Sequence, residues 1–244
     1  MAVLEPRGWS PAAVARLRGR GVRVLAYLSV LELPQWEIPA TGLGSESFLH
    51  VQGAPWFRPE YDTVVVDPRV PSWRRYLEGR ALAFVSAGWD GLFLDGLGDL
   101  EDPVLDGQLG VLLPAAATLV GGLRQITAGR LLVVNNGIWS VLPWIAPHLD
   151  AVCWEVAEAP TAVDDRHIGA ALEALAAAAV GHGVGRWLLT AVAPDRPDAA
   201  RRASAFTAFA AAQGFVAYVA PGDYALGVRG LDGGFYPAPR PPAR

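Results

Sequence analysis

Short apolar runs alternate along the chain with longer segments that mix apolar and polar residues. Eight such runs occur, at residues 2–5, 23–30, 63–67, 91–95, 131–136, 151–156, 187–192 and 215–219. Their centres are rich in Val, Leu and aromatic residues and show no strict polar alternation, which is typical of strands buried on both faces. We therefore predict eight strands in a parallel sheet.

Helical signals fill the spaces between these runs. Ser10 followed by Pro11 is an N-cap with proline at the first helical position. Further helices are expected at 72–87, 109–127, 141–147, 164–180 and 198–213, several of them ending at a glycine. Regular strand–helix alternation predicts parallel βαβ units, and eight units predict an α/β fold, a single (β/α)8 TIM barrel. A doubly wound open sheet is the alternative.

Two segments interrupt this rhythm. Residues 33–62 contain Trp36, Trp56 and several prolines and glycines, and we predict a long binding loop after the second strand. Residues 237–244, with the sequence PAPRPPAR, predict an extended or disordered Pro-rich tail. The expected catalytic domain therefore covers residues 1–236.

Composition narrows the functional classes. The 244 residues suit one large α/β domain, and 52% hydrophobic with 18% charged residues argue against disorder. The net charge of −4 comes without a basic patch, so we expect no nucleic-acid partner. We also expect no membrane partner, because the sequence shows no apolar stretch that reaches the length of a span. With no signal peptide visible, cytoplasmic location is the expectation, and an extracellular one would require that a signal had been removed.

Metal and cofactor motifs are missing from the sequence. Cys153 is the single cysteine and lies in an apolar run, so we predict a small buried hydrophobe. The four histidines have no ligand spacing, and no Gly-rich phosphate loop, dinucleotide fingerprint or nucleophile elbow occurs. We therefore predict no metal and no cofactor.

Polar residues end most of the predicted strands, where the active site of a barrel lies. They are Glu5, Ser29, Glu32, Asp67, Asp95, Asn135, Asn136, Glu155, Thr190 and Tyr218. Asp95 closes the run GLFLD, and Glu155 lies inside the run AVCWEV. Two carboxyl groups across a barrel mouth are what glycoside hydrolysis requires. A helix cap for Asp95 and a structural arginine partner for Glu155 are the competing interpretations.

Amide and aromatic side chains near these strand ends could bind sugar. Asn135 and Asn136 can hydrogen-bond sugar hydroxyls, although Asn136-Gly137 also predicts a simple turn. Trp139 lies in a predicted loop, where its ring could stack on a sugar or pack the loop. Four other tryptophans, at positions 73, 89, 154 and 187, are expected in the core.

Three stretches resemble the family 114 glycoside hydrolases, the endo-α-1,4-polygalactosaminidase group and its uncharacterised bacterial relatives. They are VLAYLSV at 24–30, the Trp73 helix after Asp67-Pro68, and GWDGLFLD at 88–95. The resemblance implies a (β/α)8 barrel that cleaves α-1,4-linked galactosamine polymers with retention. It implies Asp95 as nucleophile and Glu155 as acid/base. The substrate-binding candidates around this pair are Tyr27, Ser29, Glu32, Asp67, Asn135, Asn136, Trp139 and Tyr218.

Two positions depart from the family pattern. Leu31 replaces a glycine before Glu32, and Gly98 replaces an aspartate, with Asp99 following. We expect both positions in loops that touch substrate. Two other functions stay open: a barrel that binds glycan without cutting it, and an unrelated barrel enzyme acting on a phosphorylated metabolite.

Overall fold

The computed structural model describes residues 1–156, 166–192, 195–221, 227–229 and 235–237. Its main sheet has seven parallel strands in the order β1-β2-β8-β9-β10-β11-β12. Their bounds are β1 Ala2–Leu4, β2 Val24–Ser29, β8 Gly91–Asp95, β9 Leu131–Asn135, β10 Ala151–Glu155, β11 Gly185–Val192 and β12 Val216–Pro221. The sheet curls in the manner of a TIM barrel, and no ladder joins β1 to β12 within the described residues.

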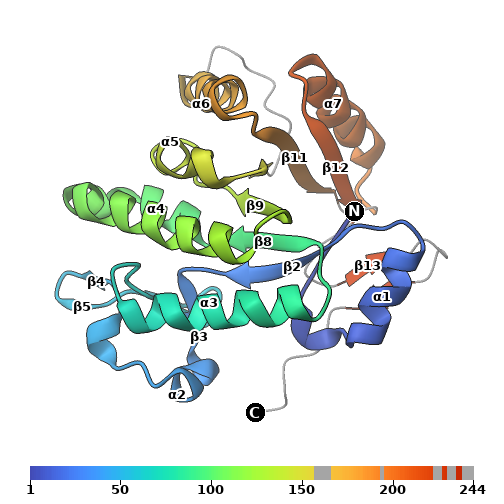
Figure 1. Ribbon diagram of the computed structural model, residues 1–244. Helices are drawn as coiled ribbons and strands as arrows, with labels where there is room; N and C mark the ends of the chain where they lie inside the picture. The colour runs from blue at the N-terminus through green and yellow to red at the C-terminus, as the bar shows by residue number, and fades with distance from the viewer. Residues whose placement is uncertain (157–165, 193–194, 222–226, 230–234, 238–244) are drawn as a thin grey trace.

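Helices such as α3, α4 and α6 cover the outside of this sheet, while α2 belongs to the group of elements beyond it (Figure 1). The α-helices have the following bounds. They are α1 Pro11–Gly19, α2 Ile38–Thr41, α3 Pro71–Ser86, α4 Leu109–Ile126, α5 Leu142–Ile145, α6 Arg166–His182 and α7 Ala199–Ala212. Short 3-10 helices are η1 Pro6–Gly8, η2 Gln35–Glu37, η3 Ser45–Ser47, η4 Leu97–Glu101, η5 Pro103–Gln108 and η6 Ala146–His148. Ser10 caps α1 as predicted, since its Oγ accepts the Ala13 N–H at 3.2 Å.

The third predicted strand is not part of the parallel sheet, so the prediction of eight parallel strands was wrong at this point. Strand β7 (Thr63–Val65) runs antiparallel between β3 (Glu32–Pro34) and β6 (Phe57–Arg58), and β2 pairs directly with β8. Val64 and Val65 are fully buried. An apolar run therefore has the same sequence pattern in a parallel and in an antiparallel sheet, and only the strand pairing distinguishes the two.

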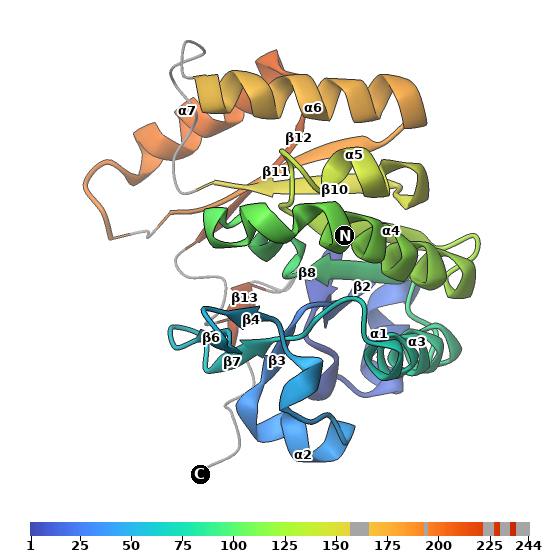
Figure 2. The same ribbon diagram turned by 90° about the vertical axis from the view of Figure 1, so that its left-hand side faces the viewer.

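Residues 33–62 fold into small elements, not the single long loop that the sequence predicted. Besides β3 and β6, they contain α2 and the antiparallel pair of β4 (His50–Val51) and β5 (Ala54–Pro55). Figure 2 shows this group at the opposite end of the molecule from α6 and α7. A further antiparallel pair, β13 (Gly227–Arg229) with β14 (Phe235–Pro237), lies near the C-terminus. The predicted tail beyond Pro237 lies outside the described residues.

The main sheet buries apolar side chains on both faces. Its inner face carries Leu25, Phe93, Val133, Ala151 and Cys153, whereas residues in between, such as Leu92 and Leu94, pack against the helices. Cys153 is 4% exposed, which confirms the prediction of a small buried hydrophobe. Because side chains alternate between faces, Asp95, Asn135 and Glu155 follow the inner residues at the carboxyl ends. The curl of the sheet thus gathers these three side chains on one face.

Helix α4, together with η5 before it, forms a long apolar segment. Residues 103–126 have the length and hydropathy of a membrane-spanning helix. Leu112, Ala116, Val120 and Leu123 are nevertheless fully buried against the rest of the fold. One third of the apolar window is buried, and the buried side chains recur at helical spacing, so α4 buries one face against the rest of the fold.

Candidate active site

Asp95 ends β8, and the chain turns sharply after it. Gly96 has φ +89°, a conformation that favours glycine, and is the N-cap of η4 without any side-chain cap hydrogen bond. The helix-cap interpretation of Asp95 is therefore not supported. Instead, the Tyr27 hydroxyl donates to Asp95 Oδ2 at 2.7 Å. Burial and the nearby Asp95 carboxylate raise the pKa of Tyr27, so the phenol keeps its proton for this bond.

Glu155 ends β10 and is partly buried at the same edge of the sheet. Burial is the main cause that raises the pKa of its carboxyl, and the Asp95 carboxylate adds to the effect. A hydrogen bond from the side chain of Asn135 acts in the opposite direction. No ion pair among the described residues joins Glu155 to an arginine, so its environment is not that of a structural salt bridge.

Asn135 connects the two carboxyl groups. Its Nδ2 donates to Asp95 Oδ1 at 3.1 Å and to Glu155 Oε2 at 2.9 Å. Because one nitrogen contacts both oxygens, these oxygens lie no farther apart than the sum of the two lengths, about 6 Å. The three residues come from neighbouring strands β8, β9 and β10. The middle strand thus places its amide between the outer two carboxyl groups.

Asn136 hydrogen-bonds to the backbone of the site. Its φ is +57° and that of Gly137 is +72°, as expected for the Asn-Gly turn that the sequence left open. Its Oδ1 accepts the backbone N–H of Glu155 at 3.0 Å. Glu101 then holds the following turn, accepting the N–H groups of Ile138, Ser140 and Val141. Asn136 therefore positions Glu155 in this structure.

A second acidic group lies beside Asp95. Arg58 of the β6 strand donates to Asp99 Oδ1 at 2.6 Å, and Thr63 donates to Glu32 Oε2 at 2.7 Å. Burial, followed by the charge of Glu32, raises the pKa of Asp99 to about 7. Its Oδ2 is buried without a donor in the described part of the chain, and the Glu32 carboxyl is the group placed to share its proton.

The other predicted binding residues are dispersed. The Ser29 hydroxyl donates to the Glu32 carbonyl at 2.7 Å and so shapes the turn after β2. Asp67 is held by the backbone and guanidinium of Arg69, outside the parallel sheet. Trp139 stacks on His167 with ring centroids 4.0 Å apart, so one of its faces is already covered. Tyr218 is 55% exposed on β12.

Glu5 and Thr190 complete the strand-end pattern. Glu5 follows β1 and lies close enough to Tyr27 for its charge to contribute to the raised pKa of that phenol. Glu5 accepts hydrogen bonds from Arg7 at the start of η1, and Thr190 is buried in β11. The side chain of Leu31 is fully buried in the main core, while its backbone lies beside Gly96 in the turn that follows Asp95. A side chain at Gly98 would meet Asn136 Cβ at 3.3 Å, so this position packs against the turn that follows β9.

Sequence reasoning missed the contributions of Arg58 and Glu101. Arg58 lies between the rings of Trp56 and Tyr61, in the segment that was expected to be a loop. Its only sequence signal is a cation among aromatic residues. Glu101 falls between two predicted elements, and nothing in its local sequence indicates that it binds the turn after β9.

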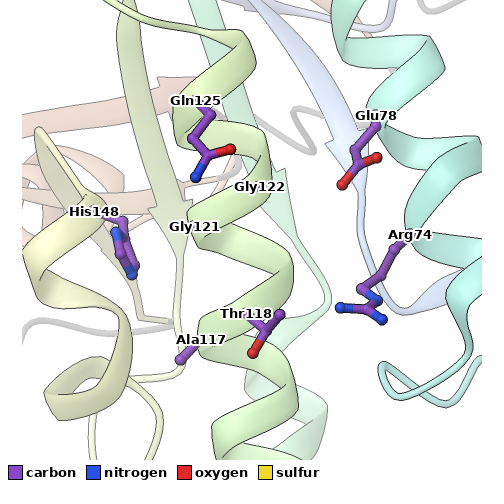
Figure 3. Close-up of a pocket in the computed structure, with 8 residues that line it drawn as sticks. All are labelled: Arg74, Glu78, Ala117, Thr118, Gly121, Gly122, Gln125 and His148. Carbon is purple, nitrogen blue, oxygen red and sulfur yellow. The ribbon is translucent and has the colours of Figure 1, made fainter.

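The outside of the fold carries a separate groove. A hollow of about 500 Å³ lies between α3 and α4, lined by Arg74, Glu78, Thr118, Gln125 and His148 together with small residues of α4. Figure 3 shows Arg74 and Glu78 on one side of α4 and His148 on the other. The groove is on the helix side of the sheet, whereas the carboxyl pair faces inward. No group of three or more potential metal ligands occurs among the described residues.

Comparison with known proteins adds to this geometry. No protein-family model matches the chain. No curated protein sequence matches it either. Among solved structures, the glycoside hydrolase domain of PelA from Pseudomonas aeruginosa matches with 29% identity and a TM-score of 0.69, over 90% of this chain and 86% of that one.

More distant structures share the fold. Ega3 from Aspergillus fumigatus, solved in complex with galactosamine, matches with 13% identity and a TM-score of 0.65, over 87% of this chain and 80% of that one. The α-galactosidase TtGalA from Thermus thermophilus matches with 12% identity and a TM-score of 0.59, over 86% of this chain and 48% of that one. The resemblance to family 114 glycoside hydrolases is thus confirmed: the chain is similar over most of its length to the PelA glycoside hydrolase domain and shares its fold with Ega3.

Proposed function

We propose that the protein is a retaining glycoside hydrolase that cleaves α-linked, galactosamine-containing polysaccharide. The observation that carries the proposal is the Asn135 bridge, which keeps Asp95 and Glu155 oxygens within about 6 Å of each other. Retaining enzymes place their carboxyl groups about 5–5.5 Å apart, and inverting enzymes about 6.5–9.5 Å apart. The bridged separation supports the retaining mechanism, and the likeness to the PelA domain supports the reaction class.

The hydrogen bonds support different roles for the two carboxyl groups. Asp95 accepts one bond on each oxygen, from Tyr27 and from Asn135, and both donors stabilise its ionised form. Asp95 is therefore the proposed nucleophile, which attacks the anomeric carbon while the glycosidic bond breaks. Burial favours the protonated form of Glu155, the proposed acid. Glu155 gives its proton to the leaving oxygen and then takes one from the water that hydrolyses the glycosyl-enzyme.

The charges around the site support a cationic sugar. Asp95, Glu155, Glu32 and Asp99 meet there, and Arg58 is the one cationic side chain that contacts this group in the described part of the chain. A cluster with excess negative charge attracts the ammonium group of an amino sugar. The complex of Ega3 with galactosamine is consistent with this substrate class. We also propose that the curled sheet closes into a complete (β/α)8 barrel around such a substrate.

Product release from galactosamine-rich polysaccharides tests the proposal. Wild-type protein should release oligosaccharides, and folded Asp95→Asn and Glu155→Gln variants should not, because each lacks one of the two reacting carboxyl groups. Asp106→Asn, a change at an exposed aspartate of η5, is the control and should retain activity. NMR of the first product should show the anomeric configuration of the substrate.

Two results would contradict the proposal. Inversion of the anomeric centre would refute the retaining mechanism. Tight binding of the polysaccharide by wild type and by Asp95→Asn, with cleavage by neither on acetylated or deacetylated chains, would favour a glycan-binding barrel that does not cut.

A further inference from the structure

Asn135 occupies an unusual position for a residue that was expected to hold sugar hydroxyls. The residue is 6% exposed, and both hydrogens of its amide point to carboxyl groups of the site. An amide nitrogen has only two hydrogens to donate. Asn135 therefore has no donor left for a substrate.

The acceptor atom of the same amide supports this orientation. Asn135 Oδ1 is buried and accepts no hydrogen bond from the described residues. Leaving a buried acceptor without a donor is unfavourable, so the two bonds on the nitrogen side must offset that cost. Rotating the amide by 180° would turn Oδ1 towards the Asp95 carboxylate, which can only accept when ionised. The carboxyl pair thus fixes which end of the amide faces it.

The strand order explains how one side chain reaches both groups. Asn135 pairs with Cys153 on β10, so Glu155 lies two residues farther along its strand, whereas Asp95 follows the Leu94–Val134 pair on β8. Because neighbouring strands lie about 4.8 Å apart, the backbones of Asp95 and Glu155 are separated by two strand spacings across the sheet and by this offset along it. Asn135 on β9 stands between them. The inner-facing carboxyl groups converge across the curled sheet, and the two hydrogen bonds from Asn135 hold the bonded oxygens within about 6 Å of each other.

We infer that Asn135 is a positioning residue for the two carboxyl groups: it sets their separation and directs the acidic proton of Glu155 to Oε1. The inference rests on the proposed function and extends it. Since Asn135 donates to Glu155 Oε2, the proton of the neutral acid has to be on the other oxygen. At Asp95, the donor on Oδ1 and Tyr27 on Oδ2 fix the plane of the carboxylate. The amide thereby orients both the proton and the nucleophile without touching substrate.

The groups that face Glu155 define what should happen when the amide is removed. Asp95 faces it from β8, and Cys153 lies two residues earlier on its own strand. Strand β11 places the apolar Leu189 opposite Glu155, and Tyr218 of β12 is opposite Leu189. Without Asn135, repulsion from Asp95 and burial act unopposed, and both raise the pKa of Glu155.

A carboxyl titration tests this inference without any substrate. The ¹³C resonances of the Glu155 and Asp95 carboxyl groups would be followed against pH by NMR in wild type, Asn135→Ala and Val134→Ala. Val134 is buried on the same strand but faces the helices, so its truncation is a matched loss of packing. We expect the Glu155 midpoint to rise by about one pH unit in Asn135→Ala, the equivalent of one lost charged hydrogen bond, and to stay unchanged in Val134→Ala.

Kinetics give a second readout on an active polysaccharide. The limb of the kcat/KM pH dependence that Glu155 sets should move to higher pH in Asn135→Ala, and kcat should fall about 100-fold as the carboxyl groups separate. Asn135→Asp keeps the shape of the side chain and removes the donors, so it should lose activity wherever the introduced carboxyl is ionised. A merely structural role would leave its profile like that of wild type.

The outcomes separate this inference from the proposed function. If Asn135→Ala and wild type share the same Glu155 midpoint, or if Asn135→Asp keeps the wild-type profile, the positioning role is refuted even though the enzyme is active. If no polysaccharide is cleaved but the Glu155 midpoint shifts as expected, the proposed function fails and the control of the carboxyl pair by Asn135 stands.

Discussion

The buried carboxyl group of Asp99 should make the stability of the protein depend on pH. Its side chain is 10% exposed, bonded on one oxygen to Arg58 and close on the other to Glu32. Burial and the Glu32 charge raise its pKa to about 7, against 3.8 for an ordinary aspartate. The perturbation that isolates this effect is Asp99→Asn, which keeps the size of the side chain and its acceptor for Arg58 but cannot ionise.

The sign follows from proton binding. A carboxyl group with a raised pKa in the folded state holds its proton there while the unfolded chain has lost it, so folding is favoured at low pH. This contribution is fully present below pH 3.8 and is lost as the pH rises through 7. Each pKa unit is worth about 1.36 kcal/mol, which gives a loss of about 4 kcal/mol across the window. For a chain of this size that loss corresponds to roughly 10 °C in Tm.

Urea unfolding between pH 4 and pH 8 measures the effect. The free energy of unfolding of wild type should fall relative to that of Asp99→Asn by about 4 kcal/mol over this range, with most of the difference developed by pH 7. Asp106→Asn, at an exposed aspartate, should follow wild type at every pH. Parallel curves for wild type and Asp99→Asn would show that Asp99 is ionised throughout, and would refute the shared proton with Glu32.

Two further substitutions test the site and the sheet. Tyr27→Phe removes the donor to Asp95 Oδ2 and keeps the ring, so kcat/KM should fall about 10- to 100-fold with little change in Tm; unchanged kinetics would show that the bond does not act in the reaction. Gly91→Ala would place a methyl group 2.0 Å from the Leu131 carbonyl, so the protein should lose about 3 kcal/mol of unfolding free energy or fail to fold. Gly110→Ala, where nothing lies within 4 Å, is its control and should be neutral or stabilising, as measured by urea unfolding.

Most helices and strands could be predicted from the sequence because their signals depend on local chemistry. The Ser10-Pro11 signal predicted the start of α1, and the apolar run ending at Asp95 predicted β8 with its bounds. Burial also follows from composition: Trp73, Trp89 and Trp154 lie in the core as expected. These features need only a residue and its neighbours in sequence.

The sequence did not predict strand pairing or side-chain partners in the same way. The run at 63–67 has the composition of a core strand, yet it pairs antiparallel with β3 and β6 because the preceding segment folds back on itself. Residues 33–62 were expected to form one long loop, and they fold instead into short strands and helices. Both errors concern contacts between residues that the local pattern does not specify.

The sequence by itself determined the α/β class, most of the strands and helices, and the placement of Asp95 and Glu155 at strand ends, because periodicity and capping are local properties. The tertiary structure decided what surrounds these carboxyl groups. The curl of the sheet placed Asn135 between them, and Arg58 reached Asp99 across 41 positions of the chain. Hydrogen bonds and charge interactions depend on distance in space, and folding alone sets those distances.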